Sequence, residues 1–198
     1  MGAFAYVKFL AKSTNEHGVH SPFVFDLVTK GLYNKSKEIK EYSKNQYRKD
    51  KPTKVSLGNL ELLTRISTYT KPKRIMLAES APSAVKTCLK YGNKEAIIDS
   101  RHDSEYMPEV DKGTIYDLVY FNSLYDRKNT TRIFYDCISA THSDSVIFFN
   151  NIRETEDTLA LWESFCQHPK ATVSIDLYDK GIICFRPEQE KEHFNIRT

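Results

Sequence analysis

The residues whose types could do chemistry are scattered, and few of them stand at the spacing that a known kind of site requires. His17 and His20 stand three positions apart beside Glu16, as in some metal sites, but no Cys or Asp partner lies nearby at ligand spacing. We therefore favour a structural role, in which this segment packs onto the body of the fold. Ser80 and Ser83 lack the G-x-S-x-G elbow of a hydrolase nucleophile, so we do not expect that chemistry.

A further group of titratable residues lies in the polar stretch 100–113. Arg101, His102, Asp103 and Glu105 could supply an acid and a base, but a general base also needs a shaped pocket. The composition of this stretch favours a solvated loop.

Residues 35–54 carry a strong local positive charge. They hold eight Lys or Arg against three acids, with almost nothing apolar apart from Ile39, Tyr42 and Tyr47. This composition favours a solvated helix or loop, and it leaves open a basic patch with interleaved tyrosines that binds RNA or an acidic partner. The basic residues are Lys35, Lys37, Lys40, Lys44, Arg48, Lys49, Lys51 and Lys54.

The elements that must position these residues follow from hydrophobic periodicity. The first 70 residues read as helical, with Ser21 capping one helix, Ser56 opening another, and Lys71-Pro72-Lys73 ending it. From there strands and helices alternate. Predicted strands cover 74–78, 95–98, 114–121, 145–149, 171–177 and 182–185, with an edge strand at 193–196, and predicted helices cover 82–90, 127–140 and 154–167.

Strands that alternate with helices and end in a hairpin predict the α/β class. We expect a three-layer, Rossmann-like fold with a mostly parallel sheet, an antiparallel C-terminal hairpin and an N-terminal helical extension. Residues 1–70 would form the extension, and residues 71–198 the core on which it packs, as one folding unit.

Bulk properties exclude several classes of protein. The chain is 40% hydrophobic and 28% charged, as in ordinary globular proteins, and a net charge of +3 does not by itself imply a nucleic-acid or membrane partner. No apolar run reaches the roughly 20 residues that span a bilayer, and the first residues lack the features of a signal peptide. The four cysteines stand far apart without a C-x-x-C, so we expect buried free thiols and a cytoplasmic location.

Several segments carry a resemblance to a known family. They are Glu16–Asp26 (EHGVHSPFVFD), Val173–Leu177, Gly181–Ile183 and His193-Phe194. Together with the order of strands and helices, they make the chain resemble class I S-adenosylmethionine (SAM)-dependent methyltransferases, in particular a group of bacterial O-methyltransferase-like proteins. The resemblance covers nearly the whole chain, although the region after the second strand looks shortened. It implies the methyltransferase fold, and SAM as the cofactor of an active member.

The cofactor loop departs from the family pattern. In the family, the first strand ends in an acid and a glycine-rich turn, which lets the backbone and a helix N-terminus approach the cofactor. Here the turn 79–83 has no glycine, and a Glu79 side chain would repel the cofactor carboxylate. Asp99 matches the acid that holds the ribose, and a turn-capping Asp is an equally good interpretation. The vestigial cofactor-binding positions are thus Glu79, Ser80, Ser83 and Asp99.

The metal positions depart from the pattern too. Metal-dependent members present carboxylates after the fourth and fifth strands, and these hold a hard cation such as Mg²⁺. The resemblance leads us to expect Asp at Asn122 and Asn150, and His at or near Tyr125 and Arg153, with Asn151 alongside. Amide oxygens supply no negative charge, so these three asparagines should bind Mg²⁺ very poorly. We therefore expect no metal, and a degenerate catalytic site.

Three functions stay open on the sequence alone. We favour a catalytically inactive pseudo-methyltransferase that acts as a protein-binding or assembly module, in a homodimer or with an active paralogue, and without a cofactor. The second function is an active SAM-dependent O-methyltransferase with a divergent loop, in which Asp99 holds the ribose and residues 79–83 and 122–125 line the pocket. The third is an RNA-binding module that uses the basic segment 35–54.

Overall fold

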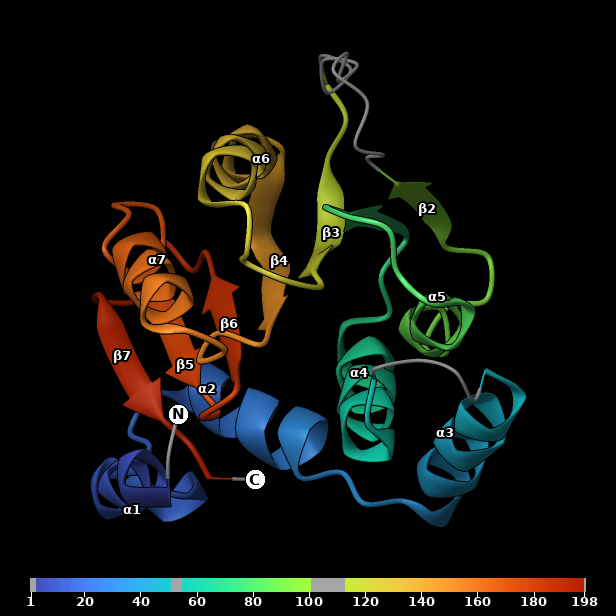
Figure 1. Cartoon of the computed structure of the whole chain (residues 1–198), viewed down its shortest axis with the longest axis horizontal. Helices are drawn as coiled ribbons and strands as arrows, with labels where there is room; N and C mark the ends of the chain where they lie inside the picture. Colours follow the sequence, from blue (N-terminus) through green and yellow to red (C-terminus); the bar gives the residue numbers. More distant parts are fainter. Residues whose placement is uncertain (1–2, 51–54, 101–112, 198) are drawn as a thin grey trace.

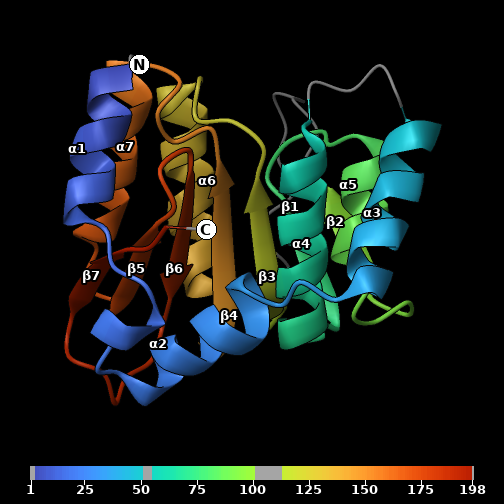
Figure 2. The ribbon, with the colours of Figure 1, turned by 90° about the horizontal axis from the view of Figure 1, so that it is seen from below.

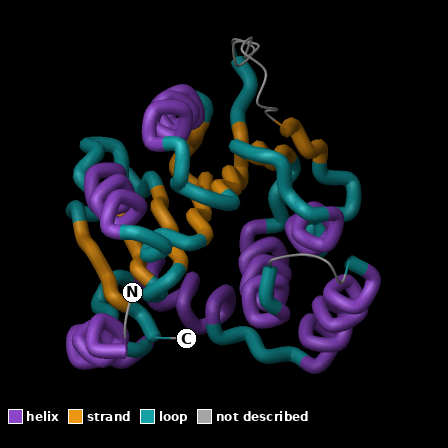
Figure 3. The backbone as a smooth tube through the Cα atoms, in the orientation of Figure 1, coloured by secondary structure: helices purple, strands orange, loops and turns teal. Residues whose placement is uncertain are grey.

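The computed structural model describes residues 3–50, 55–100 and 113–197, and within them seven strands form one sheet (Figure 1). Helices cover both faces of this sheet (Figures 2 and 3). The strands are β1 (Arg74–Leu77), β2 (Ile97–Ser100), β3 (Tyr116–Phe121), β4 (Thr141–Asn150), β5 (Val173–Asp176), β6 (Lys180–Cys184) and β7 (Glu192–Asn195). The helices are α1 (Ala3–Lys12), α2 (Pro22–Asp26), α3 (Lys37–Lys49), α4 (Leu57–Thr70), α5 (Ser83–Leu89), α6 (Arg127–Ser139) and α7 (Glu156–Cys166), with short helical segments η1 (Glu16–Gly18) and η2 (Leu27–Leu32).

The strand order is β2-β1-β3-β4-β6-β5-β7. The ladders β1–β2, β1–β3 and β3–β4 are parallel, whereas β6 runs antiparallel to both β4 and β5. The last strand, β7, lies parallel to β5 at the edge. This confirms the predicted three-layer α/β fold with a mostly parallel sheet and an antiparallel C-terminal hairpin.

A hydrophobic core lies on each face of the sheet, and alternate side chains of β4 pack into one core or the other. Val146 and Phe148 pack in a cluster with side chains of α2, η2, α4 and α5, while Ile147 and Phe149 pack with α6 and α7. All four side chains are buried. Because helices cover both faces, the strand reads as a continuous apolar run rather than as an alternating one.

The helix starts that the sequence predicts are confirmed. Ser21 Oγ accepts a hydrogen bond from Val24 N at 3.2 Å at the start of α2, and Ser56 Oγ accepts one from Asn59 N at 3.2 Å at the start of α4. The end of α4 is marked by Lys71, which adopts a left-handed conformation with φ of 45°. Each serine satisfies an N–H group that the first helical turn leaves without a partner.

Most strand boundaries differ from the prediction by one or two residues, and the start of β4 differs by four. β2 runs from 97 to 100 rather than from 95 to 98, and β4 begins at Thr141 rather than at Ser145. The added part of β4 is polar and partly exposed, so it carries no hydrophobic signal, although its backbone pairs Thr141 with Tyr116 before a register shift. Backbone pairing, rather than side-chain burial, therefore sets the start of this strand.

The turn after α5 requires a glycine because it packs directly against α4. Gly92 N donates to Ser67 Oγ at 2.9 Å, and a Cβ at this position would lie 1.9 Å from Ser67 O. All four cysteines are free and buried, as predicted. None of the helices in the described ranges has both the length and the apolar character that a bilayer span demands.

Candidate functional site

A pocket of about 660 Å³ lies where β1, β3 and β4 end, and we call it the strand-end pocket. It brings together Ser80 from the turn after β1, Asn122 and Tyr125 from the loop after β3, and Asn150 and Asn151 from the end of β4. Parallel strands place their carboxyl ends at one edge of a sheet, which is where open α/β folds bind ligands. The other lining residues are Asp50, Val55, Ala81, Pro82, Ser123 and Glu154.

The amide groups of this pocket are bonded to one another and to the core. Asn150 is buried, and its Oδ1 accepts a hydrogen bond from Asn59 Nδ2 of α4 at 2.9 Å. Its Nδ2 donates to the backbone oxygen of Asn122 at 3.4 Å. Asn122 Oδ1 in turn accepts a hydrogen bond from the hydroxyl of Tyr120 at 3.0 Å. The two positions where the family resemblance leads us to expect carboxylates thus serve as internal hydrogen-bond acceptors.

Tyr120 is held as a protonated donor. Burial, and then the negative charge of Glu79, raises the pKa of its phenol well above the usual range. Glu79 is half-buried in the turn after β1, where the family has its glycine loop. Glu79 does not line the strand-end pocket, although Ser80, Ala81 and Pro82, which follow it, do.

Two carboxylates of the pocket, Asp50 and Glu154, are not among the site residues that the sequence predicts. Asp50 follows α3, and its Oδ2 accepts a hydrogen bond from Ala84 N at 2.8 Å, in the first turn of α5. α5 has no side-chain cap from its own N-cap residue, Pro82, so Asp50 satisfies one of its free N–H groups. In the sequence Asp50 lies within a lysine-rich stretch, 34 positions from Ala84, and no local pattern signals this contact.

Three other predicted residues do not line this pocket. Asp99 lies within β2 and forms an ion pair with Arg74, whose Nε donates to Asp99 Oδ2 at 2.6 Å. Arg153 turns toward β5 and binds both carboxylate oxygens of Asp176. Ser83 is exposed at the start of α5. Their assignment to a cofactor or catalytic site stays a prediction.

The histidines and the acid–base group that the sequence analysis singles out do not form a site in the described residues. His17 and His20 are both exposed, and His17 lies 3.7 Å from the carboxylate of Glu16. Within the described ranges, no three His, Cys, Asp or Glu side chains are grouped so that they could hold a metal ion. The predicted acid–base residues at positions 101, 102, 103 and 105 lie outside the described residues.

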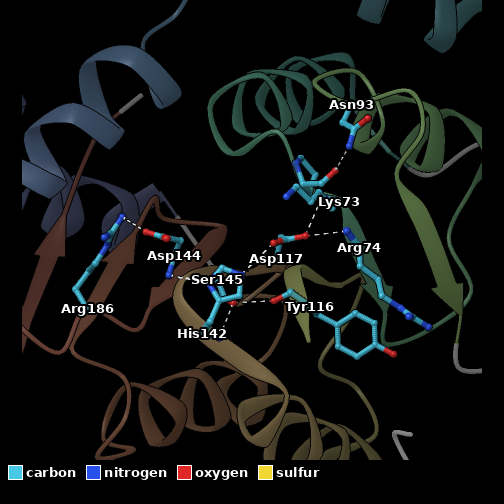
Figure 4. A network of polar contacts seen from close by, with 10 residues as sticks. Lys73, Arg74, Asn93, Tyr116, Asp117, His142, Asp144, Ser145 and Arg186 are labelled. Atoms are coloured by element: carbon cyan, nitrogen blue, oxygen red, sulfur yellow. Dashed lines mark hydrogen bonds and ion pairs between the residues drawn. The ribbon is translucent and has the colours of Figure 1, made fainter. Parts of the chain in front are cut away.

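A serine, a histidine and an aspartate do meet at the opposite edge of the sheet (Figure 4). His142 Nε2 lies 3.0 Å from Asp117 Oδ1, but His142 Nδ1 accepts a hydrogen bond from Asp144 N. Ser145 Oγ donates to Tyr116 O and accepts from His142 N, so its hydroxyl faces backbone atoms rather than an imidazole. This network joins β1, β3 and β4, and it is not arranged as a nucleophile and base.

Within the basic segment, residues 37–49 form α3, which Ser36 caps. Its lysines are exposed, whereas Tyr42 and Tyr47 pack against the core. The Tyr42 hydroxyl donates to Thr87 O at 3.4 Å, and its ring lies 4.5 Å from the ring of Tyr91. These tyrosines therefore do not stand free to stack on bases. RNA binding through the lysines stays a prediction, and Lys51 and Lys54 lie outside the described residues.

Asn122 and Asn150 do not offer Mg²⁺ free ligand atoms, because their amide oxygens already accept internal hydrogen bonds. The carboxylates of the lining, Asp50 and Glu154, stand at other positions than those where the resemblance leads us to expect metal ligands. Nor does the pocket suit the carboxylate end of SAM. Asp50 already accepts the Ala84 N–H, and Asp50 and Glu154 both place negative charge on the lining.

No protein-family model matches the chain, and no curated protein matches it in sequence. Solved structures match its fold. A Staphylococcus aureus protein provisionally named as a caffeoyl-CoA O-methyltransferase superposes with a TM-score of 0.54 at 11% identity, over 83% of this chain and 97% of that one. A Podospora anserina methyltransferase solved with SAH gives a TM-score of 0.48 at 11% identity, over 92% and 94% of the two chains. An O-methyltransferase from Bacillus cereus, also solved with SAH, gives a TM-score of 0.41 at 13% identity, over 88% of this chain and 98% of that one.

Proposed function

Because the chain has the fold of class I O-methyltransferases, we propose that it is a methyltransferase-like protein that transfers no methyl group and acts by binding another protein. One observation carries this proposal: the polar groups at the strand ends bond to each other. The side chain of Asn150, at the end of β4, bonds to the side chain of Asn59 in α4 and to the backbone oxygen of Asn122 in the loop after β3. The polar groups of a ligand site must be free to exchange water for ligand, whereas these groups act as connections within the fold.

The electrostatics of the pocket supports the same conclusion. SAM presents its carboxylate to free N–H groups in the methyltransferase fold, and here Asp50 occupies the N–H of Ala84. The half-buried Glu79 adds negative charge in the same turn. Like charges at short range oppose binding, so the protein's own carboxylates compete with that of the cofactor. We therefore expect no cofactor.

The partner that we propose is a protein, either a second copy of this chain or a paralogous active methyltransferase. Support comes from α1, on which Phe4 and Val7 are 84% and 60% exposed. Residues three apart share one face of a helix, so these two side chains form an apolar stripe. Apolar helix faces of this kind are buried when a partner is present.

The enzymatic half of the proposal is tested by isothermal calorimetry with SAM and with SAH. We expect no heat of binding from either ligand at concentrations up to the millimolar range. A micromolar dissociation constant for SAH would overturn the proposal. As a second test, the combined change Glu79→Gly, Ser83→Gly, Asn122→Asp and Asn150→Asp should not create methyltransferase activity, because it leaves Asp50 in place.

The binding half is tested by light scattering of the purified chain over a wide concentration range, alone and mixed with a paralogous methyltransferase of the same genome. We expect a dimer in one of the two samples. The double variant Phe4→Ser/Val7→Ser should weaken the dimer, and the matched double variant Lys37→Ser/Lys44→Ser on the exposed face of α3 should not. A chain that stays monomeric in both samples would refute the binding role.

An active SAM-dependent methyltransferase is the second candidate, and the size and place of the strand-end pocket favour it. A volume of about 660 Å³ lies within the range of small-molecule sites, and the pocket opens at the strand ends. If this candidate is correct, SAH binds with a micromolar dissociation constant. If SAH does not bind, this candidate is excluded.

A further inference from the structure

A second pocket, of about 740 Å³, lies between α1 and α7 over β5 and the edge strand β7, and we call it the α1–α7 pocket. In Figure 1, α7 and α1 lie apart, near opposite ends of β7. The α1–α7 pocket shares no lining residue with the strand-end pocket. The turn after β4 separates the two, since Asn150 and Asn151 line the strand-end pocket while Arg153 lines the α1–α7 pocket.

The inner walls of the α1–α7 pocket carry no net charge. Phe9 and Trp162 are buried aromatic side chains, and Cys166 is a buried thiol whose pKa is raised to about 12, chiefly by burial, so it stays neutral. The one carboxylate of the floor, Asp176, is bound by the guanidinium of Arg153 through two hydrogen bonds of 2.7 and 2.5 Å. The interior therefore suits the apolar body of a ligand.

The rim of the pocket is positively charged. Lys8 and Lys12 lie one helical turn apart on α1, and within the described part of the chain neither forms an ion pair or a side-chain hydrogen bond. Glu163 on α7 supplies one negative charge to the lining. Two unpaired cations against one anion leave an excess of positive charge above an apolar interior. An anionic head group bound there would gain two ammonium partners.

We propose that the α1–α7 pocket binds a small amphipathic carboxylate, with its hydrocarbon or aromatic body along α7 against the half-buried Leu159, and its carboxylate between Lys8 and Lys12. This is a ligand site separate from the strand-end pocket, and it does not depend on whether SAM binds. Arg153 contributes by neutralising Asp176, which would otherwise repel an anionic ligand.

The probe for this proposal is octanoate, followed by NMR and calorimetry on the full chain. Trp162 is the only tryptophan of the chain, so its indole N–H gives a single cross-peak that reports from the pocket. We expect octanoate to shift this peak saturably, with the same dissociation constant by calorimetry. Octylamine, which has the same chain and the opposite charge, should leave the peak in place.

Two variants test the two halves of the site. Lys8→Gln/Lys12→Gln should weaken octanoate binding by about tenfold, while the control Lys37→Gln/Lys44→Gln on α3 should leave it unchanged. Ala5→Phe should fill the pocket and abolish binding while the circular dichroism spectrum is kept. Equal binding of octylamine, unchanged affinity in Lys8→Gln/Lys12→Gln, or no shift of the Trp162 peak in wild type would each overturn the proposal.

Discussion

Replacement of Arg153 by methionine tests the buried ion pair between the turn after β4 and the end of β5. The carboxylate of Asp176 is only 4% exposed, and both of its oxygens accept hydrogen bonds from the Arg153 guanidinium. Tyr178 N supplies a further bond to Asp176 Oδ1 at 2.8 Å. Methionine keeps most of the aliphatic length that packs near Phe9 but removes the charge. The variant therefore leaves a buried carboxylate with one backbone partner.

The expected cost follows from the loss of that charge. Removing one partner of a buried ion pair destabilises a protein by roughly 3–5 kcal/mol. That is a large share of a total stability of about 5–15 kcal/mol for a domain. With a urea m-value of about 2 kcal/mol/M, the unfolding midpoint of Arg153→Met should fall by roughly 1.5–2.5 M.

The assay is urea unfolding followed by circular dichroism. The control is Lys30→Met, which breaks an ion pair of similar length, 2.7 Å, that is exposed to solvent on both sides. Exposed pairs contribute little, so the midpoint of this control should stay near that of wild type. Adding Asp176→Asn to Arg153→Met should restore part of the loss, because it removes the uncompensated charge. The reasoning is refuted if Arg153→Met lowers the midpoint no more than Lys30→Met does.

Three further predictions concern packing, pH and helix capping. Gly181→Ala places a Cβ 2.5 Å from the Trp162 ring and should lower stability by roughly 1–3 kcal/mol in thermal unfolding, whereas Gly58→Ala, with nothing within 4 Å, should not. Burial raises the pKa of Asp117, but hydrogen bonds from His142 and two backbone N–H groups outweigh it, so the folded-state pKa lies below the usual value. The Asp117 carboxylate therefore adds to the free energy of unfolding above its unfolded-state pKa, and this stabilisation is lost as the pH falls through its folded-state pKa. Asp117→Asn should make the free energy of unfolding depend less on pH over this interval. Asp50→Ala should cost roughly 0.5–2 kcal/mol in urea unfolding by uncapping α5, and Asp50→Asn, which keeps an acceptor, should cost less.

Much of the fold is predictable from the sequence because burial leaves a periodic signal. Residues 145–149 of β4 are nearly all apolar because both faces of the strand are buried. Ser21 and Ser56 mark the starts of their helices, because each caps the helix through a hydrogen bond to a residue three positions later. The start of β4 at Thr141 is not predictable in this way, because it depends on backbone pairing with Tyr116 rather than on side-chain burial.

The candidate site is only partly predictable, for a related reason. Strand ends are visible in the sequence, so Asn122 and Asn150 can be placed at one edge of the sheet. Their partners cannot be found in this way, since Asn59 lies 91 positions from Asn150 and Asp50 lies 34 positions from Ala84. These contacts between residues distant in the sequence become visible only in the three-dimensional structure.

The hydrogen-bond partners of Asn150 distinguish a ligand-binding side chain from one that holds the fold together. An amide that lines an active site loses little when its ligand leaves, because water takes the place of the ligand. Asn150 is 5% exposed, and its hydrogen bonds run to α4 and to the loop after β3. Replacing it with aspartate, as the family pattern would have it, adds a buried negative charge and removes the donor to Asn122 O. Asn150→Asp should therefore destabilise the fold.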